Sequence, residues 1–136
     1  MLYIKKLARP FMLLLALMNL GFMIWVFFYP FKTAAFVGLS ALNGNAETEL
    51  RTMYGGLIGG LGIINLLGAL SPRRTENAVW ATAWVFLGVG IVRSCGCLFF
   101  NADVWQIIFA ISEMIAAATC FIMLKSLSVV SVPELK

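Results

Sequence analysis

Histidine is absent from the 136 residues of this chain, and charged residues make up only 12% of them. Histidine is the usual haem ligand, a common zinc ligand and the commonest acid–base group at neutral pH. Bis-histidine haem sites, zinc hydrolases and Ser–His nucleophile systems therefore lose their main residue. The three cysteines contain no C-x-x-C motif, which disfavours thiol–disulfide exchange. We accordingly assign no catalytic residue, no metal ligand and no cofactor from the sequence.

Apolar residues are what the chain has in excess. Their share is 62%, against roughly 45–50% in soluble globular domains. A protein of 14.9 kDa has too large a surface relative to its volume to hide so much apolar side chain from water. The composition therefore predicts an integral membrane protein.

Four apolar stretches are long enough to cross a bilayer, which takes about 20 residues as a helix. The sequence predicts them at about 11–29, 46–70, 77–99 and 104–125. The last two are joined by a turn of a few residues, which forces an antiparallel hairpin. We expect an all-α, four-helix transmembrane bundle, with residues 1–136 forming a single membrane domain.

The basic residues in the short connections predict the orientation, because lysine and arginine concentrate on the cytoplasmic side. One side would hold Lys5, Lys6, Arg9, Arg73, Arg74, Lys125 and Lys136, and the other side Lys32. This bias predicts that both termini are cytoplasmic. Attraction to anionic lipid then accounts for the net charge of +4, so no nucleic-acid partner is implied.

Glycines in the second stretch indicate a close helix contact. Gly55 with Gly59, and Gly56 with Gly60, form two overlapping small-xxx-small pairs, which let a neighbouring backbone approach closely in lipid. We expect this contact within one chain rather than between two chains.

Three charged residues fall where the bilayer should penalise them. At about 1.5 Å per residue, Glu113 lies about 14 Å and Arg93 about 8 Å from the outer ends of their helices. Arg51 lies near the outer start of the second helix. A charge at mid-membrane costs roughly 2.5–3.5 kcal/mol on insertion scales, so each should find a partner or water. We predict a polar network of Arg51, Arg93 and Glu113, with Glu47 or Glu49 at its mouth.

Tyr54 and Gln106 could add hydrogen bonds to this network, and three interpretations of it compete. The first is purely structural, with the charges fixing the register of the helices. The second is a site open to the outer face, where two arginines receive an anionic headgroup or carboxylate. The third is proton-coupled transport through Glu113. Asn19 and Asn65 are expected to form hydrogen bonds between helices rather than to bind a ligand.

The run Ala-Glu-Thr-Glu-Leu-Arg-Thr-Met-Tyr-Gly-Gly-Leu at residues 46–57, followed by Gly-Leu-Gly at 60–62, resembles a motif of the family known as domain of unknown function 4345. Gly90 to Arg93, Asp103 and Glu113 are similar to further positions of that family. The resemblance implies a small bacterial four-helix membrane protein. It also implies that the site residues are Glu49, Arg51, Tyr54, Arg93 and Glu113. It implies no activity.

For function, we expect a non-enzymatic accessory or assembly subunit, or a lipid-binding module, in the bacterial inner membrane. Its expected partners are membrane lipids and a larger membrane complex or a second copy of the chain. The alternative is a small transporter, or a membrane enzyme, that acts on a lipid-like or anionic substrate through Glu113, Arg93 and Arg51.

Overall fold

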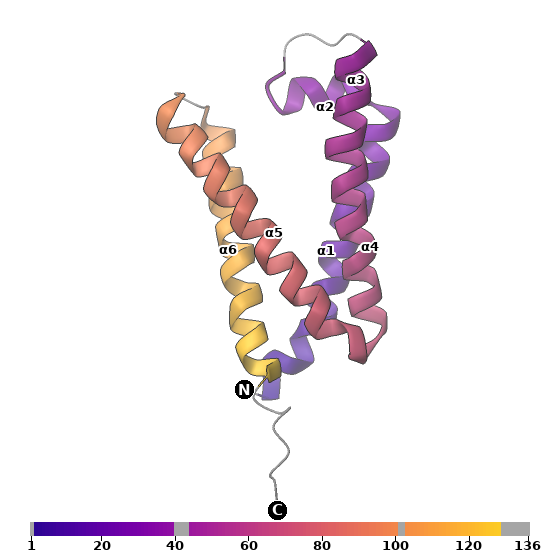
Figure 1. The fold of residues 1–136 in the computed structure, drawn as a ribbon, viewed down its shortest axis with the longest axis vertical. Helices are drawn as coiled ribbons and strands as arrows, with labels where there is room; N and C mark the ends of the chain where they lie inside the picture. Colours follow the sequence, from indigo (N-terminus) through magenta and orange to yellow (C-terminus); the bar gives the residue numbers. More distant parts are fainter. Residues whose placement is uncertain (1, 40–43, 101–102, 129–136) are drawn as a thin grey trace, which may run out of the picture.

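A computed structural model describes residues 2–39, 44–100 and 103–128, and these ranges are almost entirely helical with no strand among them (Figure 1). The elements in chain order are α1 (Leu2–Phe28), α2 (Pro30–Phe36), α3 (Gly44–Leu50), the π-helix η1 (Arg51–Leu57), α4 (Ile58–Leu70), α5 (Pro72–Phe99) and α6 (Val104–Ser128). Four continuous helical segments are long and apolar enough to span a membrane: Lys6–Phe28, Gly44–Leu70, Pro72–Phe99 and Val104–Leu127. The predicted all-α, four-helix fold is confirmed.

The helix boundaries differ from the sequence prediction mainly at the N-terminal ends. Pro72 occupies the first turn of α5, where its missing N–H costs no hydrogen bond, so α5 begins before the predicted residue 77. Pro30 plays the same role in α2, and Tyr29 belongs to the junction rather than to α1. The short helix α2 lies in the connection between the first two spans. Leu42, Lys136 and the turn residues Asn101 and Ala102 lie outside the described residues.

The helices form two antiparallel hairpins that diverge from a common end. α1 packs mainly against α4 and η1, whereas α5 packs mainly against α6. The start of α1, the turn between α4 and α5 and the end of α6 lie together, and we call this the basal end (Figure 1). At the other end, which we call the open end, the α5–α6 hairpin leans away from α1 and α4 (Figure 1).

The largest core cluster explains why the helices converge at the basal end. It combines residues from all four long helices and consists of Ala8, Met12, Leu15, Ala69, Ala78, Val79, Ala83, Cys120 and Met123. A second cluster, made of Val26, Ala34 and Leu50 with Phe22 and Tyr54 packed against it, lies in the α1–α4 half alone. The two halves therefore share a core at one end and separate toward the other.

Hydrogen bonds close the basal end as well. Arg9 Nε donates to the carbonyl of Ala69 at 2.8 Å, and Thr75 Oγ1 donates to the carbonyl of Gly68 at 2.8 Å. Both acceptors lie in the last turn of α4, where carbonyls have no partner within the helix. Further along, Thr82 Oγ1 donates to Asn65 Oδ1 at 2.5 Å and joins α5 to α4, which confirms the interhelical bond expected of Asn65.

Of the four glycines predicted to pack against a neighbouring helix, two do so and two do not. Gly55 lies against Val26, and Gly59 lies so close to Met23 of α1 that a β-carbon there would overlap its sulfur. Gly56 and Gly60, in contrast, are exposed and meet no side chain within 4 Å. Gly62, whose added β-carbon would stand 2.9 Å from Leu20 Cγ, completes the contact face instead. The close contact predicted from the glycines therefore exists, within the chain, on one of the two faces.

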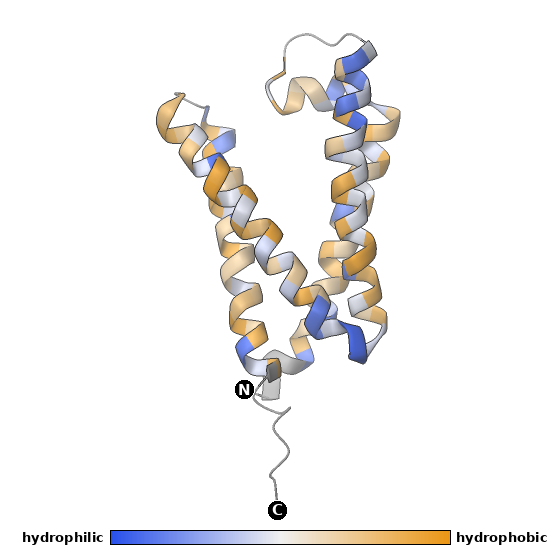
Figure 2. Ribbon diagram, in the orientation of Figure 1, coloured by the Kyte–Doolittle hydropathy of each residue, from blue (hydrophilic) through white to orange (hydrophobic). Residues whose placement is uncertain are grey.

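The exterior is apolar over most of the length of both hairpins, whereas polar residues gather at α3 and at the basal turn (Figure 2). Large side chains such as Leu17, Phe28 and Val92 are mostly exposed. In water such a surface would aggregate, but in a bilayer the lipid tails cover it. The chain is thus a membrane protein, with four helices long and apolar enough to span the bilayer.

Candidate functional site

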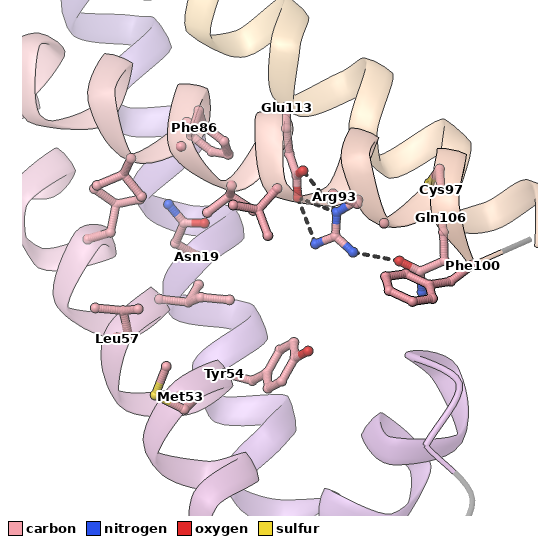
Figure 3. A pocket seen from close by; sticks show the side chains of 17 residues that line it. Asn19, Met53, Tyr54, Leu57, Phe86, Arg93, Cys97, Phe100, Gln106 and Glu113 are labelled. Carbon is pink, nitrogen blue, oxygen red and sulfur yellow. Dashed lines mark hydrogen bonds and ion pairs between the residues drawn. The ribbon is translucent and has the colours of Figure 1, made fainter. Parts of the chain in front are cut away.

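A cleft of about 850 Å³ lies between the diverging hairpins. One wall is formed by η1 and α4 and the other by α5, with Asn19 of α1 and Gln106 and Glu113 of α6 also lining it. The lining residues are Asn19, Met53, Tyr54, Leu57, Ile58, Leu61, Val85, Phe86, Gly88, Val89, Val92, Arg93, Gly96, Cys97, Phe100, Gln106 and Glu113. Most of them are apolar, and the polar ones lie on both walls (Figure 3). The volume falls within the range of about 300–1,000 Å³ that is typical of small-molecule sites.

Arg93 and Glu113 form the polar centre of the cleft, as the sequence predicts for this pair. Arg93 Nε lies 3.0 and 2.9 Å from the two carboxylate oxygens of Glu113, and Nη2 lies 2.9 Å from Oε1. The side chains are 27% and 13% exposed, respectively. Two-point contact of this kind is both strong and directional. The pair is held across the α5–α6 hairpin and remains accessible from the cleft (Figure 3).

Neighbouring residues on the hairpin fix the position of this pair. Gln106 Oε1 accepts a hydrogen bond of 2.6 Å from Arg93 Nη1, and the guanidinium stands 5.7 Å from the ring centroid of Phe109. Gly90 allows the two helices to approach, since a β-carbon there would be 3.4 Å from Glu113 Cβ. Asp103 Oδ1 accepts from the backbone N–H groups of Trp105 and Gln106 and so caps the start of α6.

Tyr54 approaches the pair from the opposite wall. Its ring extends from η1 into the cleft on the side facing Arg93 (Figure 3). π-Helical turns are rare and often occur at functional sites, because the extra residue changes the direction of the side chains. η1 coincides with the Arg-Thr-Met-Tyr-Gly-Gly-Leu run, so the most distinctive motif in the sequence forms the wall opposite the ion pair.

Asn19 supplies another polar group in the cleft wall. Its Nδ2 atom is buried and has no hydrogen-bond partner among the described residues. The bond between helices that the sequence predicts for Asn19 is therefore not formed by its amide nitrogen. A buried donor without a partner costs about 1–3 kcal/mol. Asn65 Nδ2, which lies outside the cleft, is buried and unpaired in the same way, so the missing partner does not mark Asn19 as a ligand group.

Arg51 does not join the Arg93–Glu113 pair, so the predicted network of three residues is wrong in this respect. Arg51 Nη1 lies 2.6 Å from Glu47 Oε1, one turn earlier on the same helical segment. Its Nε donates to the carbonyl of Phe27, at 3.2 Å. Arg51 lines a separate recess of about 320 Å³ with Met23 and Phe27. Arg51 and Tyr54 therefore present their side chains to different recesses, although they are one turn apart.

Glu47 and Glu49 likewise do not line the cleft. Glu47 forms an ion pair with Arg51, and Glu49 is exposed on α3. The structure thus brings together Tyr54, Arg93 and Glu113 of the predicted site residues and leaves Glu49 and Arg51 outside. Two arginines acting on one anion, as the sequence suggested, are not available in the cleft.

Contacts between α2 and α6 link the two hairpins at the open end. The rings of Phe36 and Phe109 lie 5.6 Å apart, and Gln106 Nε2 lies 3.4 Å from the carbonyl oxygen of Val37. Gln106 therefore contacts both Arg93 and the segment that follows α2. These long-range contacts join different parts of the chain, and no local pattern in the sequence indicates them.

A pattern of small residues in the sequence indicates the wall of the cleft that α5 forms. Gly88, Val92 and Gly96 recur every four residues and thus share one face of α5, with Val85 and Val89 beside them. Gly88 and Gly96 meet no other side chain within 4 Å of a β-carbon. Small residues on a helix face that no neighbour fills are what leaves room for the cleft.

These features define a small all-α membrane protein with an apolar cleft and a polar centre. The chain matches the family described as Domain of unknown function (DUF4345) over residues 7–124, and it belongs to that family. Comparison with curated proteins and with solved structures finds no match for the chain.

Proposed function

We propose that this protein is a lipid-binding module that takes one amphiphilic molecule into the cleft between its hairpins. Its apolar chain would lie along Leu57, Leu61 and Val89, and its polar head would lie near Arg93. The single observation that carries the proposal is the position of the Arg93–Glu113 pair in the wall of a largely apolar cleft. An ion pair that served only to hold α5 against α6 would not need to be accessible from the cleft.

The composition of the cleft supports a lipid rather than a polar solute. Its walls consist mainly of aliphatic and aromatic side chains, and several of them are exposed, including Met53, Leu57 and Val92. Apolar ligands gain free energy roughly in proportion to the apolar area that they cover. A polar solute would leave most of this surface in contact with water.

The experiment is to identify and quantify lipids that remain bound after purification in mild detergent. Gly88 lines the cleft, and a β-carbon there meets no atom within 4 Å, so Gly88→Phe should project into the cleft without straining the helices. We expect Gly88→Phe to abolish stoichiometric lipid binding. Gly60→Phe is the matched control, because Gly60 is equally unhindered but lies outside the cleft. Equal lipid content in both variants would contradict the proposal.

The same purification tests the other functions expected from the sequence. An accessory subunit would retain a second protein in stoichiometric amount. A small transporter would support proton-dependent flux by itself in liposomes, with loss of flux in Glu113→Gln. Either result without bound lipid would replace the lipid-binding proposal.

The location in the bacterial inner membrane, with both termini cytoplasmic, is part of the proposal. It rests on the basic residues at the basal end, where Lys6, Arg9, Arg73, Arg74 and Lys125 occur. With the basal end cytoplasmic, the open end of the cleft would lie toward the outer leaflet. The lipid would then enter from that leaflet, between α2 and α5.

A further inference from the structure

The polar centre of the cleft carries no net formal charge. Arg93 and Glu113 are the charged residues that line the cleft, and each is the other's partner. Both oxygens of Glu113 accept from Arg93, so the negative charge lies within hydrogen-bond distance of the positive charge. The Arg51 guanidinium, which could have left a net positive charge, lies in the other recess and is paired with Glu47.

The centre nevertheless has hydrogen-bond donors to spare. A guanidinium has one N–H group on Nε and two on each Nη. Glu113 takes the Nε donor and one from Nη2, and Gln106 takes one from Nη1. One N–H on each terminal nitrogen is left, and the terminal nitrogens face the side of the cleft where Tyr54 lies (Figure 3). The Tyr54 hydroxyl adds a further donor to the lining.

From this combination, we infer that the site selects an amphiphile with an uncharged head that offers carbonyl oxygens, and that it discriminates against carboxylate and phosphate heads. This inference rests on the lipid-binding function proposed above. A carbonyl oxygen can accept from the spare N–H groups of Arg93 without displacing Glu113. The ester groups of a diacylglycerol and the ring carbonyls of a quinone share this chemistry.

An anionic head would bind less favourably at this centre than an uncharged one. To reach the Arg93 guanidinium, its oxygens must approach Glu113, which already occupies one edge of that group. Like charges repel strongly where little water screens them. The anion would also have to lose its hydration on entering an apolar cleft, and Arg93, the cation among the described lining residues, is already paired.

The test measures the binding of four probes to the full-length protein in nanodiscs of zwitterionic lipid. The uncharged probes are dioleoylglycerol and a short-chain ubiquinone, and the anionic probes are phosphatidic acid and, at alkaline pH, oleic acid. We expect at least one uncharged probe to bind the wild-type protein about tenfold or more tightly than either anion. The two uncharged probes distinguish an ester from a quinone as the source of the carbonyl.

Glu113→Gln tests the cause of this preference. The amide oxygen can still accept from Arg93 while the negative charge is removed, so the centre acquires a net positive charge. We expect the affinity of the anionic probes relative to the uncharged probes to rise about tenfold. Glu47→Gln removes one negative charge outside the cleft and should change neither class.

The possible failures can be told apart. Tighter binding of the anionic probes by the wild-type protein, or equal binding of both classes, overturns the headgroup selectivity and leaves lipid binding intact. An unchanged preference in a folded Glu113→Gln variant overturns it too, and the wild-type comparison still decides if that variant does not fold. No binding of any probe, together with no effect of Gly88→Phe on bound lipid, overturns both proposals.

Discussion

Gly90 lies directly against Glu113, because a β-carbon at position 90 would stand 3.4 Å from Glu113 Cβ and 2.8 Å from Met114 Sδ. The absence of a side chain on α5 therefore sets how closely α6 can approach and where the carboxylate meets Arg93. Gly90→Val should push the hairpin apart and destabilise the protein by about 1–3 kcal/mol. Gly88→Val, two residues earlier on an open face, is the control. Equal unfolding midpoints of the two variants in detergent would show that α6 does not depend on this approach.

Double-mutant cycles should distinguish two ion pairs of the described residues, Arg93–Glu113 and Arg51–Glu47. For Arg93 and Glu113, changed singly and together to Gln, we expect a coupling free energy of about 1.5–3 kcal/mol, as for hydrogen bonds between charged groups. For Arg51 and Glu47, which are four residues apart on one helical segment and 37% and 27% exposed, we expect only about 0.3–0.5 kcal/mol. Reversible unfolding in mixed micelles measures both. Similar values for the two cycles would argue against a special role of the pair in the cleft.

The two glycine faces of the second span should respond in opposite ways to the same substitution. Gly59→Leu would overlap Met23 and should destabilise the α1–α4 contact by about 1–3 kcal/mol. Gly60→Leu meets open space and should leave the unfolding free energy almost unchanged or raise it, because leucine favours the helix over glycine. A marked fall in the unfolding free energy of Gly60→Leu, accompanied by a change in oligomeric state, would indicate that a second copy of the chain packs on that face.

The sequence predicts correctly those features that have a local cause in the chain, and it fails for features that depend on how distant segments pack. The four spans follow from runs of apolar residues, and the Arg93–Glu113 pair follows from a short hairpin that brings two costly charges together. The similar depth of Arg51 and Arg93 in the membrane predicts that they meet, and this prediction is wrong. Depth in the membrane does not fix the side of a helix. Across the π-helical turn of η1, Tyr54 faces the cleft while Arg51 faces Phe27.

The cleft itself could not be predicted from the sequence. It depends on the core being shared by all four spans at the basal end and restricted to one hairpin at the open end. That distribution is a property of long-range packing among similar apolar side chains. The stripe containing Gly88, Val92 and Gly96 shows only that one face of α5 has little volume, and such a face could equally well have been filled by a neighbouring helix.

The hydrogen bond between Thr82 and Asn65 should contribute to the junction of the two hairpins. Both residues are fully buried, and Thr82→Val keeps the shape while removing the donor. The expected loss of stability is about 0.5–1.5 kcal/mol, since hydrogen bonds between membrane helices are modest. Thr119→Val is the matched control, because the Thr119 hydroxyl donates to a carbonyl of its own helix. Equal effects of the two variants would mean that the bond does not hold the hairpins together.

The orientation predicted from the basic residues can be tested at the two ends of the bundle. Glu76 lies near the start of α5, which begins at the basal end, and Asp103 directly precedes α6, which begins at the open end (Figure 1). Both residues are exposed. In a variant whose native cysteines are replaced, Asp103→Cys should react with a membrane-impermeant thiol reagent added to spheroplasts. Glu76→Cys should react only after the membrane is broken, since Arg73 and Arg74 favour the cytoplasmic side for that turn. The reverse labelling pattern would place the open end of the cleft at the inner leaflet, and with it the side from which a lipid enters.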